Sequence, residues 1–188
     1  MVGMSSPSDA VSTYIFAKDG NRPHLMRRAF TEDAELEIVV KTDAISFPSS
    51  AKGSSAIEDI VVRRFGLDYE NVYTFCLSQP SQANRRHFPC HWLVGMSARS
   101  DGQIRIGCGR YDWYFGPDKA CRVERLVIAI DVMKVFPATG FAASMDWLSS
   151  LPYPWCTPDQ ALSAAPAIEG FAEIKSYLAK VRPLSAEG

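Results

Sequence analysis

Two histidines lie four residues apart in a β-rich stretch that reads His87-Phe88-Pro89-Cys90-His91. Alternate side chains of a strand share a face, so His87 and His91 are expected to point the same way, with Phe88 and Cys90 on the opposite face. Pro89 lacks an N–H and could sit at a bulge or an edge, which would shift this pattern by one residue. An imidazole titrates near neutral pH, so it can take or give a proton in an enclosed site.

A carboxylate beside such an imidazole would fix its tautomer and raise its basicity. The pair would suit proton abstraction next to a carbonyl, dehydration or an aldol-type cyclisation, and none of these reactions needs a metal or a cofactor. Tyr111 and Asp112 follow Gly109-Arg110 and either line a cavity or bridge strands, as strand tyrosines often do. Asp131 interrupts an apolar strand, and if it faces inward it needs a partner or a function, because a buried unpaired charge is costly.

The first half of the chain predicts helices and one strand. Tyr14, Ile15 and Lys18 recur at helical spacing in a helix from 9 to 18, capped by Ser8 or Asp9, and Tyr14 and Ile15 should face the core. The other predicted elements are a short helix at 22–30, a strand at 34–40, a helix at 55–65 and an edge strand at 72–77.

The second half is β-rich. Residues 87–98, 103–115 and 122–136 read as long strands, and Asp101-Gly102 is a hairpin signal between the first two. Strands of this length suggest a strongly curved antiparallel sheet. Because helices come first and a meander follows, the predicted fold class is α+β.

Beyond residue 136 the composition changes to proline, serine and aromatic residues. Thr157-Pro158 predicts a helix start, and an apolar stripe from Ile168 to Val181 predicts a further amphipathic helix. We therefore expect one domain over 1–136 and a loop and helical C-terminal extension over 137–188, packed on the body or on a partner chain.

Composition excludes several classes of function. Twenty basic and twenty-one acidic residues give a net charge of −1, which argues against nucleic acid as the main partner. The five cysteines show no C-x-x-C spacing, so a reducing cytoplasmic location is expected and no metal site is predicted. The longest apolar run, Leu126–Ile130, is far too short for a membrane span, and residues 1–10 lack the features of a signal peptide.

Several segments, taken in order, resemble one known family. They are the stretch from Tyr14 to Phe30 that leads into a strand, then Arg86-His87-Phe88, and then Gly109-Arg110-Tyr111-Asp112. Together they resemble the SnoaL-like branch of the nuclear-transport-factor-like superfamily, which includes scytalone dehydratase and polyketide cyclases. Over about residues 8–136 the resemblance implies a cone-shaped curved sheet wrapped round N-terminal helices, with an internal cavity.

The resemblance also implies a site. In dehydratase-like members an aspartate just after the first helix and a histidine that opens a sheet strand act inside the cavity, and Asp19 and His87 match those positions. Lys18 stands where the dehydratase has a tyrosine, and His91 stands where an asparagine is usual. Taken by themselves, Asp19 before Gly20 could be a solvated turn residue, and His87 could be a structural histidine.

Three functional hypotheses follow. The first is a cofactor-independent lyase or isomerase of a small apolar or aromatic compound, with Asp19 and His87 catalytic and Tyr14, His91 and Tyr111 orienting the substrate. Asp112 and Asp131 complete the predicted substrate-binding set. The second is a non-catalytic ligand-binding module, and the third is a structural subunit of a larger enzyme. A homodimer through the outer sheet face is expected for either of the first two, because an apolar outer face needs cover.

Overall fold

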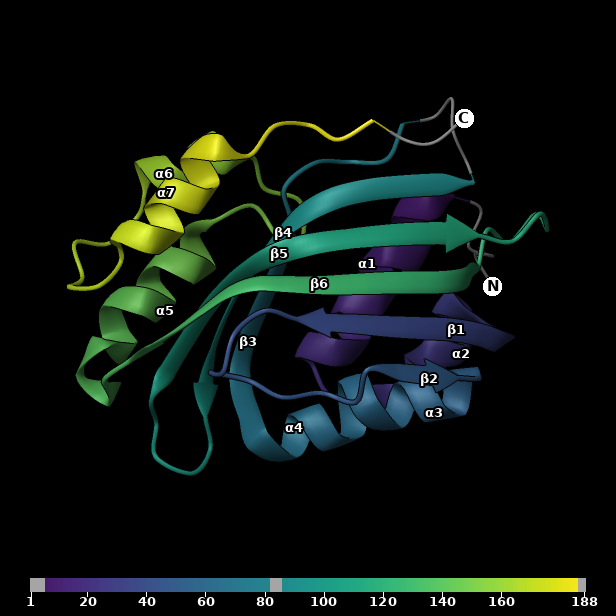
Figure 1. The fold of residues 1–188 in the computed structure, drawn as a ribbon, viewed down its shortest axis with the longest axis horizontal. Coiled ribbons are helices and arrows are strands. Elements are labelled where there is room, and N and C mark those ends of the chain that lie inside the picture. The colour runs from purple at the N-terminus through teal and green to yellow at the C-terminus, as the bar shows by residue number, and fades with distance from the viewer. Residues whose placement is uncertain (1–5, 82–85, 186–188) are drawn as a thin grey trace.

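The computed structural model describes residues 6–81 and 86–185, which form a six-stranded sheet with helices against both of its faces (Figure 1). The strands are β1 (Phe30–Val40), β2 (Ser50–Lys52), β3 (Tyr69–Cys76), β4 (His87–Ala98), β5 (Ile104–Phe115) and β6 (Val123–Phe136). Their order across the sheet is β2-β1-β6-β5-β4-β3. The α+β class is confirmed, and the three long strands match the predicted ranges to within one residue.

The sheet is mixed, which corrects the prediction of a purely antiparallel one. β1 and β6 pair in parallel, whereas the other neighbouring strands pair antiparallel. A parallel pair needs a long crossover connection between its strands. Here the elements from β2 to β5 lie between β1 and β6 in the sequence. The local sequence pattern of neither strand predicts that the two strands pair.

The N-terminal helix, α1 (Pro7–Asp19), begins at Ser6, whose hydroxyl accepts a hydrogen bond from the backbone N–H of Asp9. The cap therefore lies two or three residues before the predicted Ser8 or Asp9, with Pro7 in the first turn, where its missing N–H costs nothing. Tyr14 and Ile15 are 1% and 0% exposed, so the prediction that they face the core is confirmed.

The remaining helices of the first half lie on the same face of the sheet as α1 (Figure 1). They are η1 (Pro23–Leu25), α2 (Met26–Ala29), α3 (Ser54–Glu58), η2 (Asp59–Arg64) and α4 (Phe65–Asp68). The last three form one continuous helical segment over the predicted helix at 55–65, and η2 is a π-helical stretch within it. Ile57, Val61 and Phe65 point into the core beneath the sheet.

The pairing of β4 with β5 runs without interruption from His87↔Tyr114 to Ser97↔Ile104, so Pro89 makes no bulge. The predicted alternation along β4 therefore holds. Phe88, Cys90, Trp92 and Val94 lie on the inner face, which packs on the N-terminal helices; His87, Pro89, His91 and Leu93 lie on the outer face.

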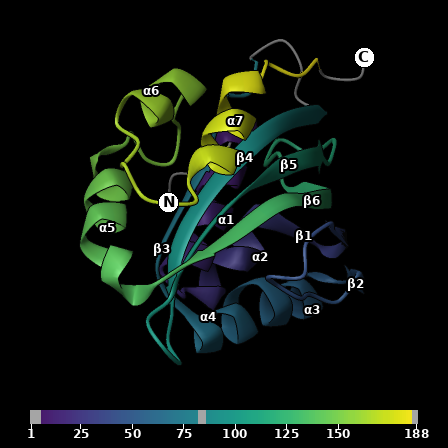
Figure 2. The ribbon, with the colours of Figure 1, turned by 60° about the vertical axis from the view of Figure 1, so that its left-hand side comes forward.

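The C-terminal extension covers one end of the outer face (Figures 1 and 2). It contains the short turn η3 (Ala138–Gly140) and three helices, α5 (Phe141–Ser150), α6 (Pro158–Ser163) and α7 (Ala172–Lys180). Side chains of α5 and α7 pack on outer-face residues of β3–β6 and form a second hydrophobic core. The helix start predicted at Thr157-Pro158 is confirmed, and a capping box forms it: Thr157 accepts from the backbone N–H of Gln160, whose side chain accepts from the backbone N–H of Thr157. The capping box expected at residues 55–58 does not form, because α3 begins after Gly53 without a side-chain cap.

Helix α5 was not predicted, because prolines and serines around residues 137–158 suggested a loop. Its buried residues Ser144, Trp147 and Leu148 nevertheless follow helical spacing. The helix approaches β4 closely at Gly95, where an added Cβ would lie 2.3 Å from the Leu148 side chain.

The extension bears on the expected homodimer. The apolar part of the outer face is covered by the same chain, so the need for cover that motivated a dimer is already met there. The predicted division of the chain at residue 136 stays a prediction. Within the described residues, no helix is both long and apolar enough to cross a membrane.

Candidate functional site

A cavity lies between α1 and the inner face of the sheet. The volume of the cavity is about 50 Å³, several times the ~10–15 Å³ that one water needs. Most lining side chains are aliphatic or aromatic. The polar groups in the wall come from Tyr14, Lys18, Thr74, Trp92 and Tyr111.

Lys18 brings a charge into this apolar wall, although the whole residue is only 8% exposed. Its Nζ donates to Oδ1 of Asp19 at 2.9 Å and to Oγ1 of Thr74 at 2.8 Å, and it lies 4.7 Å from the centre of the Phe65 ring. An ammonium has three N–H donors. Two of them have these protein partners, and the third has no hydrogen-bond partner among the described residues.

Asp19 lies behind Lys18 and fixes it in place. The carboxylate is 4% exposed and accepts four hydrogen bonds. Oδ1 accepts from Lys18 and from the Thr74 hydroxyl; Oδ2 accepts from the Thr74 backbone N–H at 2.7 Å and from the Tyr153 hydroxyl at 2.8 Å. Asp19 is thus neither a solvated turn residue nor part of the cavity wall, and it reaches the cavity through Lys18 and Thr74.

Tyr14 and Tyr111 form a second polar group in the wall. Their rings meet edge to face, with centroids 6.2 Å apart, and both residues line the cavity. Burial raises the pKa of both phenols, so both keep their protons and can act as hydrogen-bond donors. Tyr14 and Lys18 are four residues apart on α1 and therefore project from the same side of the helix.

Trp92 carries a buried indole N–H that has no hydrogen-bond partner among the described residues. Gly109 leaves room for this ring, since an added Cβ would lie 2.5 Å from its Cζ2 atom. Lysine and tryptophan side chains donate hydrogen bonds and accept none. The wall is therefore suited to a ligand that is mainly apolar and carries an acceptor oxygen.

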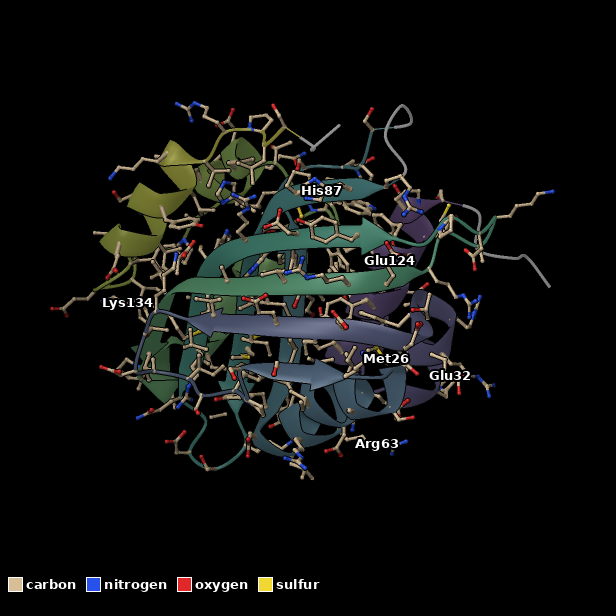
Figure 3. The ribbon with its side chains drawn as sticks, turned by 45° about the vertical axis from the view of Figure 1, so that its right-hand side comes forward. Met26, Glu32, Arg63, His87, Glu124 and Lys134 are labelled. Atoms are coloured by element: carbon tan, nitrogen blue, oxygen red, sulfur yellow. The ribbon has the colours of Figure 1, made fainter. Side chains whose placement is uncertain are left out.

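His87 lies outside the cavity, so the predicted meeting of Asp19 and His87 is wrong. The ring is buried on the outer face of the sheet, where Figure 3 labels it on β4. Its Nε2 lies 3.1 Å from Oδ1 of Asp112, which also accepts from Arg110 at 2.9 Å, and the ring stacks on Tyr114 at 4.5 Å. Strand alternation places His87 and His91 together, but it does not say which face of the sheet is the inner one.

His91 and Asp131 also lie on the outer face, under α7. Nδ1 of His91 lies 3.1 Å from the hydroxyl of Tyr177, which donates to Oδ2 of Asp131 at 2.8 Å; Lys41 donates to Oδ1 at 2.7 Å. Asp131 has the partners that a part-buried carboxylate needs. Burial alone would raise its pKa, but the hydrogen bonds from Lys41 and Tyr177 outweigh burial and lower it.

Of the seven predicted site residues, the structure brings three to the cavity or next to it and four to the outer face. Tyr14 and Tyr111 line the cavity and Asp19 adjoins it. The four on the outer face are His87, His91, Asp112 and Asp131. Thus the predicted catalytic pair is separated, although its aspartate adjoins the cavity.

Lys18 and Thr74 were not among the predicted site residues. A signal for Lys18 existed, because it belongs to the helical stripe of Tyr14 and Ile15 that faces the core. A lysine on such a stripe is either paired or functional. Thr74 becomes relevant only once β3 lies beside the end of α1, which no local pattern predicts.

The described residues contain no group of three or more His, Cys, Asp or Glu side chains that could hold a metal ion. All five cysteines are buried free thiols. The polar groups that line the cavity are the Lys18 ammonium, the phenols of Tyr14 and Tyr111, the Thr74 hydroxyl and the Trp92 indole N–H, and the Asp19 carboxylate lies behind them.

Comparison with family models and with curated proteins found no match. Solved structures share the fold. A nuclear transport factor 2-like superfamily protein from Salmonella enterica is 15% identical, with a TM-score of 0.52 over 66% of this chain and 88% of that chain. A hexachlorocyclohexane dehydrochlorinase from Novosphingobium barchaimii is 11% identical, with a TM-score of 0.53 over 68% and 86% of the two chains.

A computationally designed 17-OHP binder is 13% identical, with a TM-score of 0.53 over 69% of this chain and 98% of the designed one. These identities are too low to transfer an activity, because one fold can host many functions. The matched part accounts for about two thirds of this chain. The chain has the α+β fold of the nuclear transport factor 2-like superfamily.

Proposed function

We propose that the chain is a cofactor-independent lyase or isomerase that acts on a small, mainly apolar carbonyl compound in the inner cavity. One observation carries this proposal: the buried Lys18 ammonium, held by Asp19 and Thr74, stands in an otherwise apolar wall. A buried charge in a cavity is a candidate for function, since a purely structural core has no need of it.

Binding would place the oxygen of the compound among hydrogen-bond donors. Lys18 offers its third N–H, and the Tyr14–Tyr111 pair offers a phenol proton. The apolar remainder would pack on side chains such as Val94, Ile128 and Met133. Donors in a dry site stabilise negative charge on an oxygen far better than they do in water.

The reaction would use Lys18 and Asp19 in place of the separated Asp19–His87 pair. Lys18 gives a proton from its ammonium to the carbonyl oxygen, and the amine so formed takes a proton from the neighbouring carbon, which restores the ammonium beside Asp19. The C–H electron pair forms the new C=C bond while the C=O π pair moves to the oxygen, to which the phenols donate. Isomerisation returns the same proton to another carbon; dehydration delivers it to a leaving hydroxyl, which departs as water.

A non-catalytic binding module is the second candidate, favoured by a specific observation. Among the described residues, no carboxylate or imidazole lines the cavity, and Asp19 already accepts four hydrogen bonds. The third hypothesis, a structural subunit, expected contacts through Phe88, Cys90, Trp92 and Val94. It loses that basis because these side chains are buried in the inner core.

A homodimer stays a proposal and would have to use the uncovered part of the outer face. That part carries charged side chains, including the pair formed by Glu37 and Arg125 at 3.2 Å. Partner copies would therefore meet through polar groups rather than through an apolar sheet face.

The first test compares benzoate with toluene, which share a ring but differ in oxygen. We expect the wild type to bind benzoate at least tenfold more tightly than toluene, measured by NMR chemical-shift titration. Lys18→Met should remove that preference, because it keeps the length of the side chain and loses the charge. Lys52→Met is the matched control, since Lys52 pairs with Glu35 on an exposed strand.

The same three proteins then distinguish an enzyme from a binding module. Deuterium exchange at the carbon next to the carbonyl of acetophenone in D₂O reports proton abstraction without knowledge of the natural substrate. A rate above buffer that is lost in Lys18→Met supports the enzyme. Binding without exchange would favour the binding module, and equal affinity for benzoate and toluene would overturn both forms of the proposal.

A further inference from the structure

Tyr153 links the C-terminal extension to the cavity site. It lies between α5 and α6, and its ring contacts Phe16 of α1 at 5.6 Å and Phe75 of β3 at 5.7 Å between centroids. Its hydroxyl donates to Oδ2 of Asp19 at 2.8 Å, across 134 residues of sequence. The residue is 40% exposed, whereas the carboxylate that it contacts is 4% exposed.

The hydroxyl of Tyr153 is a permanent donor. Burial of the phenol raises its pKa, and the neighbouring Asp19 carboxylate raises it further, so the group stays protonated. Hydrogen bonds from neutral donors to an ionised carboxylate are among the stronger kinds in proteins. The contact therefore restrains Asp19 near neutral pH.

Asp19 receives its hydrogen bonds from three separate parts of the fold. Lys18 is its neighbour on α1, Thr74 belongs to β3, and Tyr153 belongs to the extension. The lysine and the threonine hydroxyl share Oδ1, whereas Tyr153 and the Thr74 backbone N–H share Oδ2. Without Tyr153, Oδ2 would keep one donor and the carboxylate could rotate, taking Lys18 with it.

We propose that Tyr153 is a positioning residue for the cavity: through Asp19 it holds the Lys18 ammonium at the wall where a ligand oxygen would bind. The extension is then part of the site and not an independent addition to the cone. The effect on ligands rests on the proposed function. The effect on Lys18 does not depend on it.

Tyr153→Phe tests the inference, since it keeps the ring contacts with Phe16 and Phe75 and removes only the hydroxyl. Tyr177→Phe is the matched control, because Tyr177 is also an extension tyrosine that donates to a carboxylate, that of Asp131 on the outer face. Both full-length variants are first compared with the wild type by urea unfolding, so that the readouts below refer to folded protein.

The first readout is the ¹H–¹⁵N signal of the Lys18 ammonium, assigned by its absence from Lys18→Met. We expect Tyr153→Phe to shift or broaden this signal and Tyr177→Phe to leave it in place. The second is benzoate affinity, which Tyr153→Phe should weaken roughly 3- to 10-fold, as expected for the net contribution of one ordinary hydrogen bond. In an Asp19→Asn background, Tyr153→Phe should have no further effect on affinity.

The outcomes separate the two proposals. An unchanged Lys18 signal in folded Tyr153→Phe overturns the positioning role, whatever the ligand result. An equal loss of affinity from Tyr153→Phe with and without Asp19 also overturns it, because the residue would then act by packing alone. If the wild type does not bind benzoate, the proposed function fails, while the Lys18 signal still decides the role of Tyr153.

Discussion

The side chains of Lys18 and Asp19 form an ion pair that is shielded from water. Each is under 10% exposed, and the Nζ–Oδ1 distance is 2.9 Å. Removal of two charges from water is costly, and their attraction offsets this cost only where other hydrogen bonds satisfy the remaining donors and acceptors. The two hydrogen bonds from Thr74 and the one from Tyr153 satisfy the remaining acceptors of Asp19. Removal of either Lys18 or Asp19 alone should therefore destabilise the protein, because it leaves the other charge buried and unpaired.

Asp19→Ala should therefore lower the free energy of unfolding by about 3 kcal/mol, since it leaves the Lys18 charge buried without its partner. Asp59→Ala is the control, because the ion pair of Asp59 with Arg64 at 2.7 Å is largely exposed and should contribute under about 1 kcal/mol. Urea unfolding of both variants measures the difference. Equal losses in the two would contradict the view that Lys18 depends on Asp19.

The sequence predicted part of this site. The resemblance gave Asp19, and the helical stripe placed Tyr14 on the buried side. His87 matched the family position, but its strand presents it to the outer face, where Asp112 is its partner. Alternation along a strand determines which residues share a face; only the packing of the whole sheet determines which face is buried with the helices.

Helix α7 is held to the sheet by polar contacts as well as by its apolar residues. Tyr177 connects His91 of β4 with Asp131 of β6, and Lys41 completes the chain of contacts. Burial lowers the pKa of His91, and the Arg110 charge lowers it further, while the Gly109 carbonyl and the Asp131 carboxylate oppose this change. The folded state therefore binds a proton at His91 less readily than the unfolded chain does.

This sign predicts a pH dependence. An unfolded histidine has a pKa of about 6.5, so the contribution of His91 to stability is full above that pH and is lost as the pH falls through its lower folded value. The wild type should lose more unfolding free energy between pH 7 and pH 5 than His91→Gln does. His24→Gln, which changes an exposed histidine, should behave as the wild type. A larger loss of unfolding free energy in His91→Gln than in the wild type would contradict a lowered pKa for His91 in the folded state.

The elements of the cone were largely predictable, because each has its own local signal. The long strands show alternation, and the buried residues of α1 recur at helical spacing. The place of the extension was not predictable, since its apolar stripe fits any apolar surface. The parallel pairing of β1 with β6 was not predicted for a related reason. Strand patterns indicate which residues are buried, but they do not identify the neighbouring strand.

At the scale of the whole molecule, one sheet serves two hydrophobic cores. The inner face packs on α1–α4 and encloses the cavity, and the outer face of the same strands packs on α5–α7. Figure 2 shows the extension beside β4, close to the strands that form the cavity wall. Because β4, β5 and β6 contribute side chains to both cores, a loss of packing on one face should also destabilise the other face.

Phe171→Ala tests this coupling. Phe171 is 1% exposed and its ring contacts Trp147 and Phe136 at 5.1 and 5.8 Å, so its loss should cost about 3–5 kcal/mol. If the molecule unfolds as one unit, amide hydrogen exchange should lose protection equally in α5 and in the middle of β6. Phe141→Ala, at a 40% exposed position of α5, should change little.

Loss of protection confined to α5–α7 would show that the extension opens alone. The link from Tyr153 to Asp19 would then open with it, while the sheet around the cavity stayed folded.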